Sequence, residues 1–208
     1  MASRLMRAHE QHVADASSKP HVKPRALIVV ADGSEELEAL VLSDILTRGD
    51  MHVSTASVGH KKHNIVEANY GLKIKAEHTI EGCSYRNYEL IVLPGGLGAS
   101  RLRDDELLTK MLKKQHVSGN WYAGISSAPA IVFPAHGLLT QQQRATCDAH
   151  SKHLIPDNYV DEAVVVDGKC VTSQGPATAI AFGLKLVELL CGRQEADRVS
   201  REILSPLE

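Results

Sequence analysis

The segment 121–134, which reads WYAGISSAPAIVFP, has the residue types and spacing of a nucleophile site. Its apolar start predicts a buried strand, and the small residues from Ser127 onward predict a helix that tolerates Pro129 in its first turn. Ser126 then lies at a strand-to-helix junction without a loop. The G-x-S-x-A pattern centred on it is close to the G-x-S-x-G of a nucleophile elbow. The alternative is an ordinary strand–turn–helix with a capping serine.

Two other segments carry groups that suit the same chemistry. Glu35 and Glu36 complement the dipole of a helix that starts there, whereas Glu38 lies one turn further on, where its carboxyl can reach a group above the sheet. Pro94-Gly95-Gly96 lets the backbone approach closely. We therefore expect the N–H groups of Gly95, Gly96 and Ser127 to form an oxyanion hole. A tight turn is the alternative explanation for the two glycines.

Strands and helices alternate along the chain, which predicts an α/β fold of the flavodoxin-like type, a three-layer sandwich with a mainly parallel sheet. In such folds, sites form at the carboxyl ends of the strands, where the three segments above converge. The first helix is predicted with Ser34 as its cap and with Leu37, Leu40, Val41 and Ile45 on its buried stripe. Strands are predicted over 25–31, 51–57, 88–93 and 121–125, hairpins over 65–76 and 163–173, and helices over 35–48, 106–115, 127–132, 175–190 and 195–203.

The composition restricts the class of protein. A chain of 208 residues with 43% hydrophobic residues suits one domain, here 24–208, after a tail over 1–23 that we expect to be disordered. A net charge of −2 argues against nucleic acid as the main partner, and no apolar run is long enough to span a membrane. The four scattered cysteines have no metal-binding spacing and favour a reducing, cytoplasmic location. Organelle targeting by residues 1–23 is the alternative.

From Arg25 onward, the chain resembles the ThiJ/PfpI superfamily, and within it the Parkinson-disease-associated protein deglycase branch. The matching segments are RALIVVADGSEELE (25–38), VLPGG (92–96), AGISSAPA (123–130) and TSQGPAT (172–178). The resemblance implies a homodimer whose interface lies near the first helix and the first hairpin. It also implies glyoxalase and deglycase chemistry on a small dicarbonyl or a glycated protein, with neither a metal nor an organic cofactor.

Position 126 departs from that family, whose nucleophile is a cysteine. The family pattern implies that Glu38, kept protonated, hydrogen-bonds a low-pKa thiolate, a role that a serine hydroxyl cannot take over. We therefore expect the Ser126 form to be inactive and a cysteine form to be active. Ser126 is either a natural variant or an engineered substitution, and we favour the second.

Other roles for the site remain open. In the family a histidine lies near the nucleophile; Asp148 aligns with it here, and His150 is a candidate general base close behind. Cys147 is the candidate for a second reactive thiol. The same family implies a redox sensor that responds to oxidative stress, or a chaperone, as the non-enzymatic alternative. A serine hydrolase with the order Ser126, Asp148, His150 is a further alternative, although its acid and base normally come from separate loops.

Overall fold

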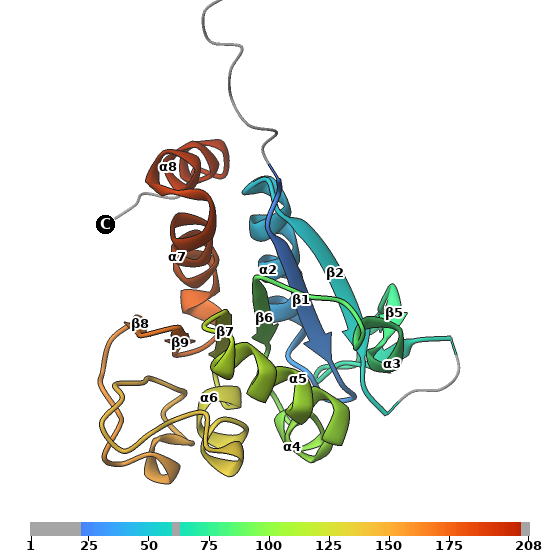
Figure 1. Cartoon of the computed structure of the whole chain (residues 1–208), viewed down its shortest axis with the longest axis vertical. Helices are drawn as coiled ribbons and strands as arrows, with labels where there is room; N and C mark the ends of the chain where they lie inside the picture. Colours follow the sequence, from blue (N-terminus) through green and yellow to red (C-terminus); the bar gives the residue numbers. More distant parts are fainter. Residues whose placement is uncertain (1–21, 60–62, 205–208) are drawn as a thin grey trace, which may run out of the picture.

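A seven-stranded sheet runs through the middle of the molecule, with helices on both faces (Figure 1). The computed structural model describes residues 22–59 and 63–204. The strand order is β5-β2-β1-β6-β7-β9-β8, and only β8 is antiparallel to its neighbour. The strands are β1 (Arg25–Val30), β2 (His52–Ser57), β5 (His78–Thr79), β6 (Leu90–Leu93), β7 (Trp121–Ile125), β8 (Val164–Asp167) and β9 (Cys170–Ser173). A separate hairpin pairs β3 (Ile65–Glu67) with β4 (Lys73–Lys75).

Two helical layers cover the sheet, one on each face. The helices are α2 (Glu36–Arg48), α3 (Ile80–Cys83), α4 (Ala99–Asp104), α5 (Glu106–Val117), α6 (Ala128–Ile131), α7 (Ala179–Cys191) and α8 (Arg193–Glu202), with 3₁₀ turns η1 (Pro134–His136), η2 (Lys152–Leu154) and η3 (Pro176–Thr178). Ile28 of β1 contributes to the core under α2, α7 and α8, whereas Leu27 contributes to the core under α3, α5 and α6. Alternate residues of β1 thus face opposite layers, and both are buried. The β-branched run at 25–30 is explained by this burial on both sides, and the predicted three-layer fold is confirmed.

The prediction for the start and the buried face of α2 was wrong in two respects. Glu35, not Ser34, is the N-cap, because its carboxylate accepts the N–H of Glu38 at 2.8 Å. The Ser34 hydroxyl instead accepts the N–H of Ala31. Leu37 and Leu40 are 47% and 52% exposed rather than buried. The helix is rotated so that Glu38 points inward, together with Ala39, Leu42, Ile45 and Leu46.

Both predicted hairpins are confirmed, as are the long helices to within a few residues of their ends. The short elements β5, α3 and α4 were not predicted. They have two, four and six residues, too few for a period of 2 or 3.6 to be recognised.

For residues 1–23 we expected disorder, with organelle targeting as the alternative. Residues 1–21 lie outside the described ranges, so both stay predictions. Over 22–59 and 63–204, every helix is too short or too polar to cross a bilayer.

Candidate active site

Ser126 lies directly after β7 in a strained backbone conformation, with φ at +61°. Its N–H donates to the Ser173 carbonyl of β9 at 3.0 Å, and its carbonyl accepts the N–H of Asp148 at 3.1 Å. A left-handed conformation costs a residue with a β-carbon about 1 kcal/mol. Hydrogen bonds from two other segments therefore hold a turn that the local sequence disfavours. The strand-to-helix elbow predicted at this serine is present.

Glu38 reaches the elbow from α2 and is fully buried. Its Oε2 accepts the N–H of Gly95 at 2.7 Å, and its Oε1 has no hydrogen-bond partner among the described residues. Burial is the main cause that raises the pKa of this carboxyl to about 7. The Gly95 N–H lowers the pKa, the charge of Glu35 raises it, the nearby Ser126 hydroxyl lowers it and the charge of Asp148 raises it. Glu38 therefore exchanges a proton near neutral pH.

The glycines after β6 bring the backbone against the elbow. A β-carbon on Gly95 would lie 2.6 Å from the Ser126 Cβ and 2.8 Å from the Ser127 nitrogen, closer than atoms can approach. Gly96 has φ +81°, and a β-carbon there would lie 2.5 Å from the Gly33 carbonyl oxygen. Only glycine fits both positions, so the close approach predicted for this loop is present.

The three N–H groups predicted as an oxyanion hole differ in their availability. The N–H of Gly95 is engaged by Glu38. Within 22–59 and 63–204, the N–H groups of Gly96 and Ser127 donate to no protein acceptor. The Ser127 hydroxyl donates to the Gly96 carbonyl at 3.1 Å and fixes these two residues relative to each other. The geometry thus leaves Gly96 and Ser127, rather than all three residues, to bind a developing negative charge.

The loop after β1 is joined to the glycine loop after β6 through the backbone. The N–H of Glu35 donates to the Gly95 carbonyl at 3.0 Å, and the N–H of Gly98 donates to the Gly33 carbonyl at 2.7 Å. The first hairpin is attached to the same place, because the N–H of Gly33 donates to the Glu67 carbonyl at 2.8 Å. Glu38 and the glycine loop are therefore positioned by one continuous network, which the sequence did not reveal.

Asp148 and His150 lie on a loop beside the elbow, but their side chains are not joined. The Asp148 carboxylate accepts the backbone N–H of His150 at 2.8 Å and both the N–H and the hydroxyl of Ser151. The His150 side chain is exposed. Asp148 thus folds its own loop, and its backbone N–H holds Ser126. A catalytic role for either residue stays a prediction, and an acid–base relay of the serine-hydrolase type is not assembled between them.

The cysteines do not provide a second reactive thiol near the elbow. Cys147 is buried, and burial followed by the charge of Asp148 raises its pKa to about 12. A thiol with this pKa stays protonated at neutral pH and is a poor nucleophile. The prediction that Cys147 is reactive is therefore wrong. Residues 22–59 and 63–204 contain no cluster of three or more His, Cys, Asp or Glu side chains arranged to hold a metal ion.

Comparisons with known proteins agree with this geometry. The model of the DJ-1/PfpI family matches residues 24–189. The chain is 37% identical over 182 residues to Protein DJ-1 homolog B of Arabidopsis thaliana, covering 87% of this chain and 41% of that protein. It is 29% identical to the glutathione-independent glyoxalase DJR-1.2 of Caenorhabditis elegans, covering 89% of this chain and 96% of that protein. The structure of oxidized Toxoplasma gondii DJ-1 superposes with a TM-score of 0.85 at 36% identity, covering 88% of this chain and all of that one.

The class of protein is defined by these matches together with the geometry, in which an elbow lies beside a buried carboxyl on a mainly parallel sheet. The chain belongs to the DJ-1/PfpI family, which confirms the resemblance seen in the sequence. It spans less than half the length of the Arabidopsis relatives that it matches, 41% and 46%.

Proposed function

We propose that the cysteine form of this protein is a cofactor-independent glyoxalase and deglycase that acts on small dicarbonyls and on their protein adducts. One observation carries the proposal: the side chain at position 126 lies on a strained elbow beside Glu38, a buried carboxyl with a pKa of about 7. A relative of similar length is named a glutathione-independent glyoxalase. The substrate class follows from the chemistry that a thiol and a proton-exchanging carboxyl perform together on adjacent carbonyl groups.

In the proposed reaction, a thiolate at position 126 attacks the aldehyde carbon of methylglyoxal, and a carbon–sulfur bond forms. The electron pair of the carbonyl moves to its oxygen, which the N–H groups of Gly96 and Ser127 stabilise. Glu38 gives this oxygen its proton, so that a hemithioacetal results. The Glu38 carboxylate then removes the proton from the former aldehyde carbon and returns it to the neighbouring carbon, while the hydroxyl proton moves to the oxygen of that neighbouring carbon, so that a thioester results. Water hydrolyses the thioester to lactate and the free thiol, so methylglyoxal plus water balances lactate.

The Ser126 form lacks the group that starts this sequence. An alkoxide requires a strong base beside the hydroxyl, whereas a protonated Glu38 is a donor and its carboxylate is a weak base. We therefore propose that the serine form is inactive. That Ser126 is an engineered substitution stays a prediction, as does a proton-transfer role for Asp148 or His150.

The test compares lactate formation from methylglyoxal by the Ser126 form and by Ser126→Cys. The expected result is turnover by Ser126→Cys and background formation by the serine form. Ser127→Cys is the matched control, because it places a thiol one residue along the same turn, outside the elbow position, and should stay inactive. Equal turnover by the two forms at position 126 would refute the proposal.

A redox-sensing role is the second candidate, and the same geometry supports it. A half-buried low-pKa thiolate at position 126 would oxidise readily to sulfinic acid, whose oxygens would accept from a protonated Glu38 and from nearby N–H groups. One structural relative is described as oxidized. Peroxide treatment of Ser126→Cys should add two oxygen atoms at residue 126, as read by peptide mass, and Glu38→Ala should slow this step. If the oxidised form gains affinity for client proteins while methylglyoxal turnover is negligible, sensing or chaperone activity replaces the enzyme as the main function.

We also propose a cytoplasmic homodimer, formed through an apolar surface on α2 and the first hairpin. Leu37 and Leu40 of α2 are about half exposed, and Ile65, Tyr70 and Leu72 of the hairpin are 41%, 81% and 45% exposed. The Glu36 carboxylate accepts the N–H of Tyr70, which keeps the two parts together. Apolar side chains gathered this way are typical of an interface. Leu40→Glu should give a monomer in light scattering, whereas the control Val117→Glu, at a site 85% exposed on α5, should stay dimeric; a dimer in both would refute this interface.

A further inference from the structure

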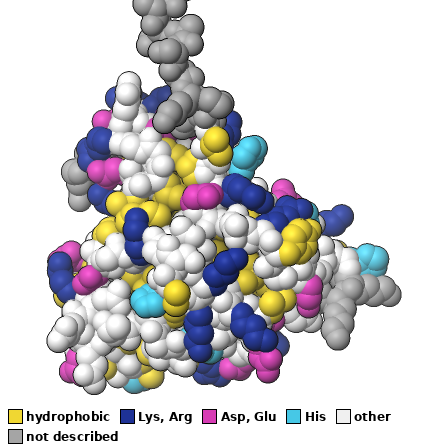
Figure 2. Space-filling view, in the orientation of Figure 1, with side chains coloured by type: hydrophobic (Ala, Val, Ile, Leu, Met, Phe, Trp, Pro, Cys, Tyr) yellow, Lys and Arg dark blue, Asp and Glu magenta, His cyan; other side chains and the backbone are white. Residues whose placement is uncertain are grey.

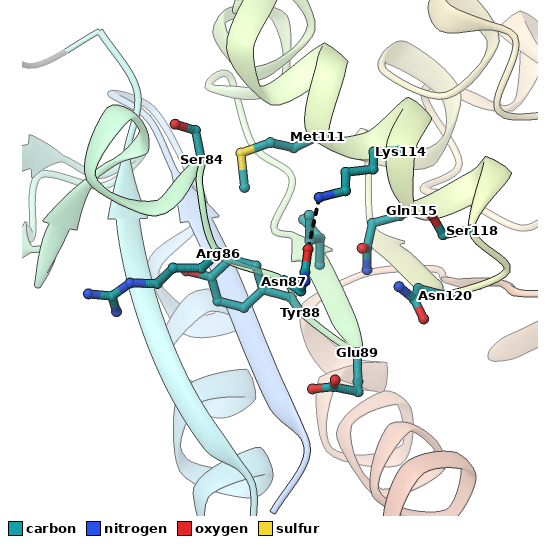
Figure 3. A pocket seen from close by; sticks show the side chains of 11 residues that line it. Ser84, Arg86, Asn87, Tyr88, Glu89, Met111, Lys114, Gln115, Ser118 and Asn120 are labelled. Atoms are coloured by element: carbon teal, nitrogen blue, oxygen red, sulfur yellow. Dashed lines mark hydrogen bonds between the residues drawn. The ribbon is translucent and has the colours of Figure 1, made fainter.

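A cavity of about 490 Å³ opens at the end of the sheet opposite the elbow (Figure 3). It lies between residues 84–91, which lead into β6, and the second half of α5, and it includes residues 118 and 120 just before β7. Ser126 follows the other end of β7. Five residues of strand at about 3.3 Å each separate the two ends by about 16 Å. The cavity is therefore separate from the candidate active site, and its volume is within the range of small-molecule sites.

The polar groups that line this cavity are held in place by hydrogen bonds. Lys114 Nζ donates to Asn87 Oδ1 at 2.8 Å, which joins α5 to the segment before β6 and fixes the ammonium group (Figure 3). Gln115 is 4% exposed, and its Nε2 donates to the Trp121 carbonyl at 3.0 Å. Its Oε1 is left as an acceptor in the wall. A ligand therefore meets a donor and an acceptor whose positions are set beforehand, which lowers the entropic cost of binding.

The charges at the cavity favour an anion. The Lys114 ammonium group faces the other polar groups of the cavity, whereas the Arg86 guanidinium extends away from them (Figure 3) and lies 5.6 Å from the centre of the Tyr85 ring. Glu89 contributes one negative charge, and one of its oxygens already accepts the N–H of Arg25 at 2.7 Å. In the described part of the chain, neither cation forms an ion pair. On the face that Figure 2 shows, lysine and arginine side chains lie over the region of α4 and α5, and acidic side chains lie among them. The Lys114 ammonium group is therefore available to pair with an anionic group in this cavity.

The remaining lining groups are suited to hydroxyls. Asn87, Asn120 and Ser118 have both donor and acceptor atoms, and they lie around the cavity with Lys114 and Gln115 in Figure 3. The apolar residues of the lining, Tyr88, Ile91 and Met111, are 3%, 1% and 7% exposed. Each of these three side chains therefore offers only a small surface to an apolar ligand.

We propose that this cavity binds a hydroxylated organic anion, of the sugar phosphate or sugar acid class. The anionic group pairs with Lys114, and the hydroxyls exchange hydrogen bonds with the amide side chains of Asn87, Gln115 and Asn120. Binding is independent of residue 126, because the cavity shares no residue with the elbow.

The test is a titration of the ¹⁵N-labelled full chain, followed by amide resonances, with glucose 6-phosphate and gluconate as the two probes. Saturable shifts at 84–91 and 114–120, at concentrations up to about 10 mM, are expected with at least one probe. Which probe binds more tightly distinguishes a sugar phosphate from a sugar acid. Glucose and inorganic phosphate, each carrying half of the proposed chemistry, should bind at least tenfold more weakly.

Lys114→Met removes the charge and keeps the apolar stem, so we expect it to weaken binding about tenfold. Lys113→Met, next along α5 but outside this cavity, is the matched control and should bind like the parent. Ser126→Cys should also bind like the parent, whether or not it turns over methylglyoxal, so failure of the proposed function and failure of this site are distinguishable. The proposal is overturned if neither probe shifts these resonances, if glucose alone binds equally well, or if the two lysine variants weaken binding equally.

Discussion

The protonated state of Glu38 predicts a particular dependence of stability on pH. The pKa of this carboxyl is about 7 in the native protein, against 4.5 for an ordinary glutamate side chain in water. Between these values, the native state keeps a proton that the unfolded chain has lost. Stability is therefore fully present below about pH 4.5, falls as the pH rises through this window, and levels off above pH 7. One pKa unit corresponds to about 1.4 kcal/mol, so the complete loss is about 3 kcal/mol, of which about 2 to 3 kcal/mol falls between pH 5 and pH 8.

The perturbation is Glu38→Gln. A glutamine keeps an oxygen to accept the Gly95 N–H and places an NH₂ where the protonated oxygen lies, so it resembles the neutral acid at every pH. We expect the free energy of unfolding of the parent to fall by about 2 to 3 kcal/mol more than that of Glu38→Gln between pH 5 and pH 8. Urea unfolding followed by the fluorescence of Trp121 measures both. Glu77→Gln, which alters an exposed carboxyl, is the control and should follow the parent.

Parallel pH profiles for the parent and for Glu38→Gln would refute the reasoning. That result would mean that Glu38 is ionised in the native protein at neutral pH. The hydrogen bond from Gly95 would then outweigh burial, and the proposed donation of a proton to the oxyanion would lose its basis.

The remaining predictions concern the elbow and the thiols. Gly95→Ala should destabilise the fold by about 2 kcal/mol or more, because the new β-carbon meets Ser126 at 2.6 Å. Gly175→Ala, where a β-carbon meets nothing within 4 Å, should change chemical unfolding by less than about 0.5 kcal/mol; equal losses would contradict the steric argument. Ser126→Gly should be about 1 kcal/mol more stable than Ser126→Ala in the same assay, since glycine adopts φ +61° freely, and the reverse order would show a relaxed elbow. The folded Ser126 form should react slowly with iodoacetamide at Cys147, whereas Ser126→Cys should gain one fast site by peptide mass; fast alkylation of Cys147 in both would contradict its raised pKa.

The elements that the sequence predicted are those whose burial leaves a periodic pattern. The runs at 25–30 and 90–93 are buried on both faces, and such runs can be recognised in a sequence. The rotation of α2 was predicted wrongly because Leu37 and Leu40 were assigned to the core. A leucine pattern does not distinguish a core from an exposed apolar surface, and an inward glutamate contradicts the usual rule for charged residues.

The candidate site was predictable where a single segment encodes it. The single segment 121–134 contains the whole pattern that predicts the elbow at Ser126. The role of the Glu38 carboxyl was predicted from the family pattern. The engagement of the Gly95 N–H by Glu38 depends on two segments 57 residues apart, and the burial of Cys147 depends on the whole layer around it. The cavity near Lys114 joins three segments with no motif in any of them. Such features arise from packing and are absent from local sequence.

The contact between the loops after β1 and β6 has a consequence for how a substrate can reach position 126. Two backbone hydrogen bonds and the absence of β-carbons at Gly95 and Gly96 leave no slack between these loops. These loops cannot open as a hinged flap to admit a substrate. Separating them would break both hydrogen bonds and leave four peptide groups without partners at once. Entry of a substrate to the elbow therefore does not depend on separating these two loops. The contact between the two loops thus keeps Glu38 and position 126 at a fixed distance from each other while a substrate enters or a product leaves.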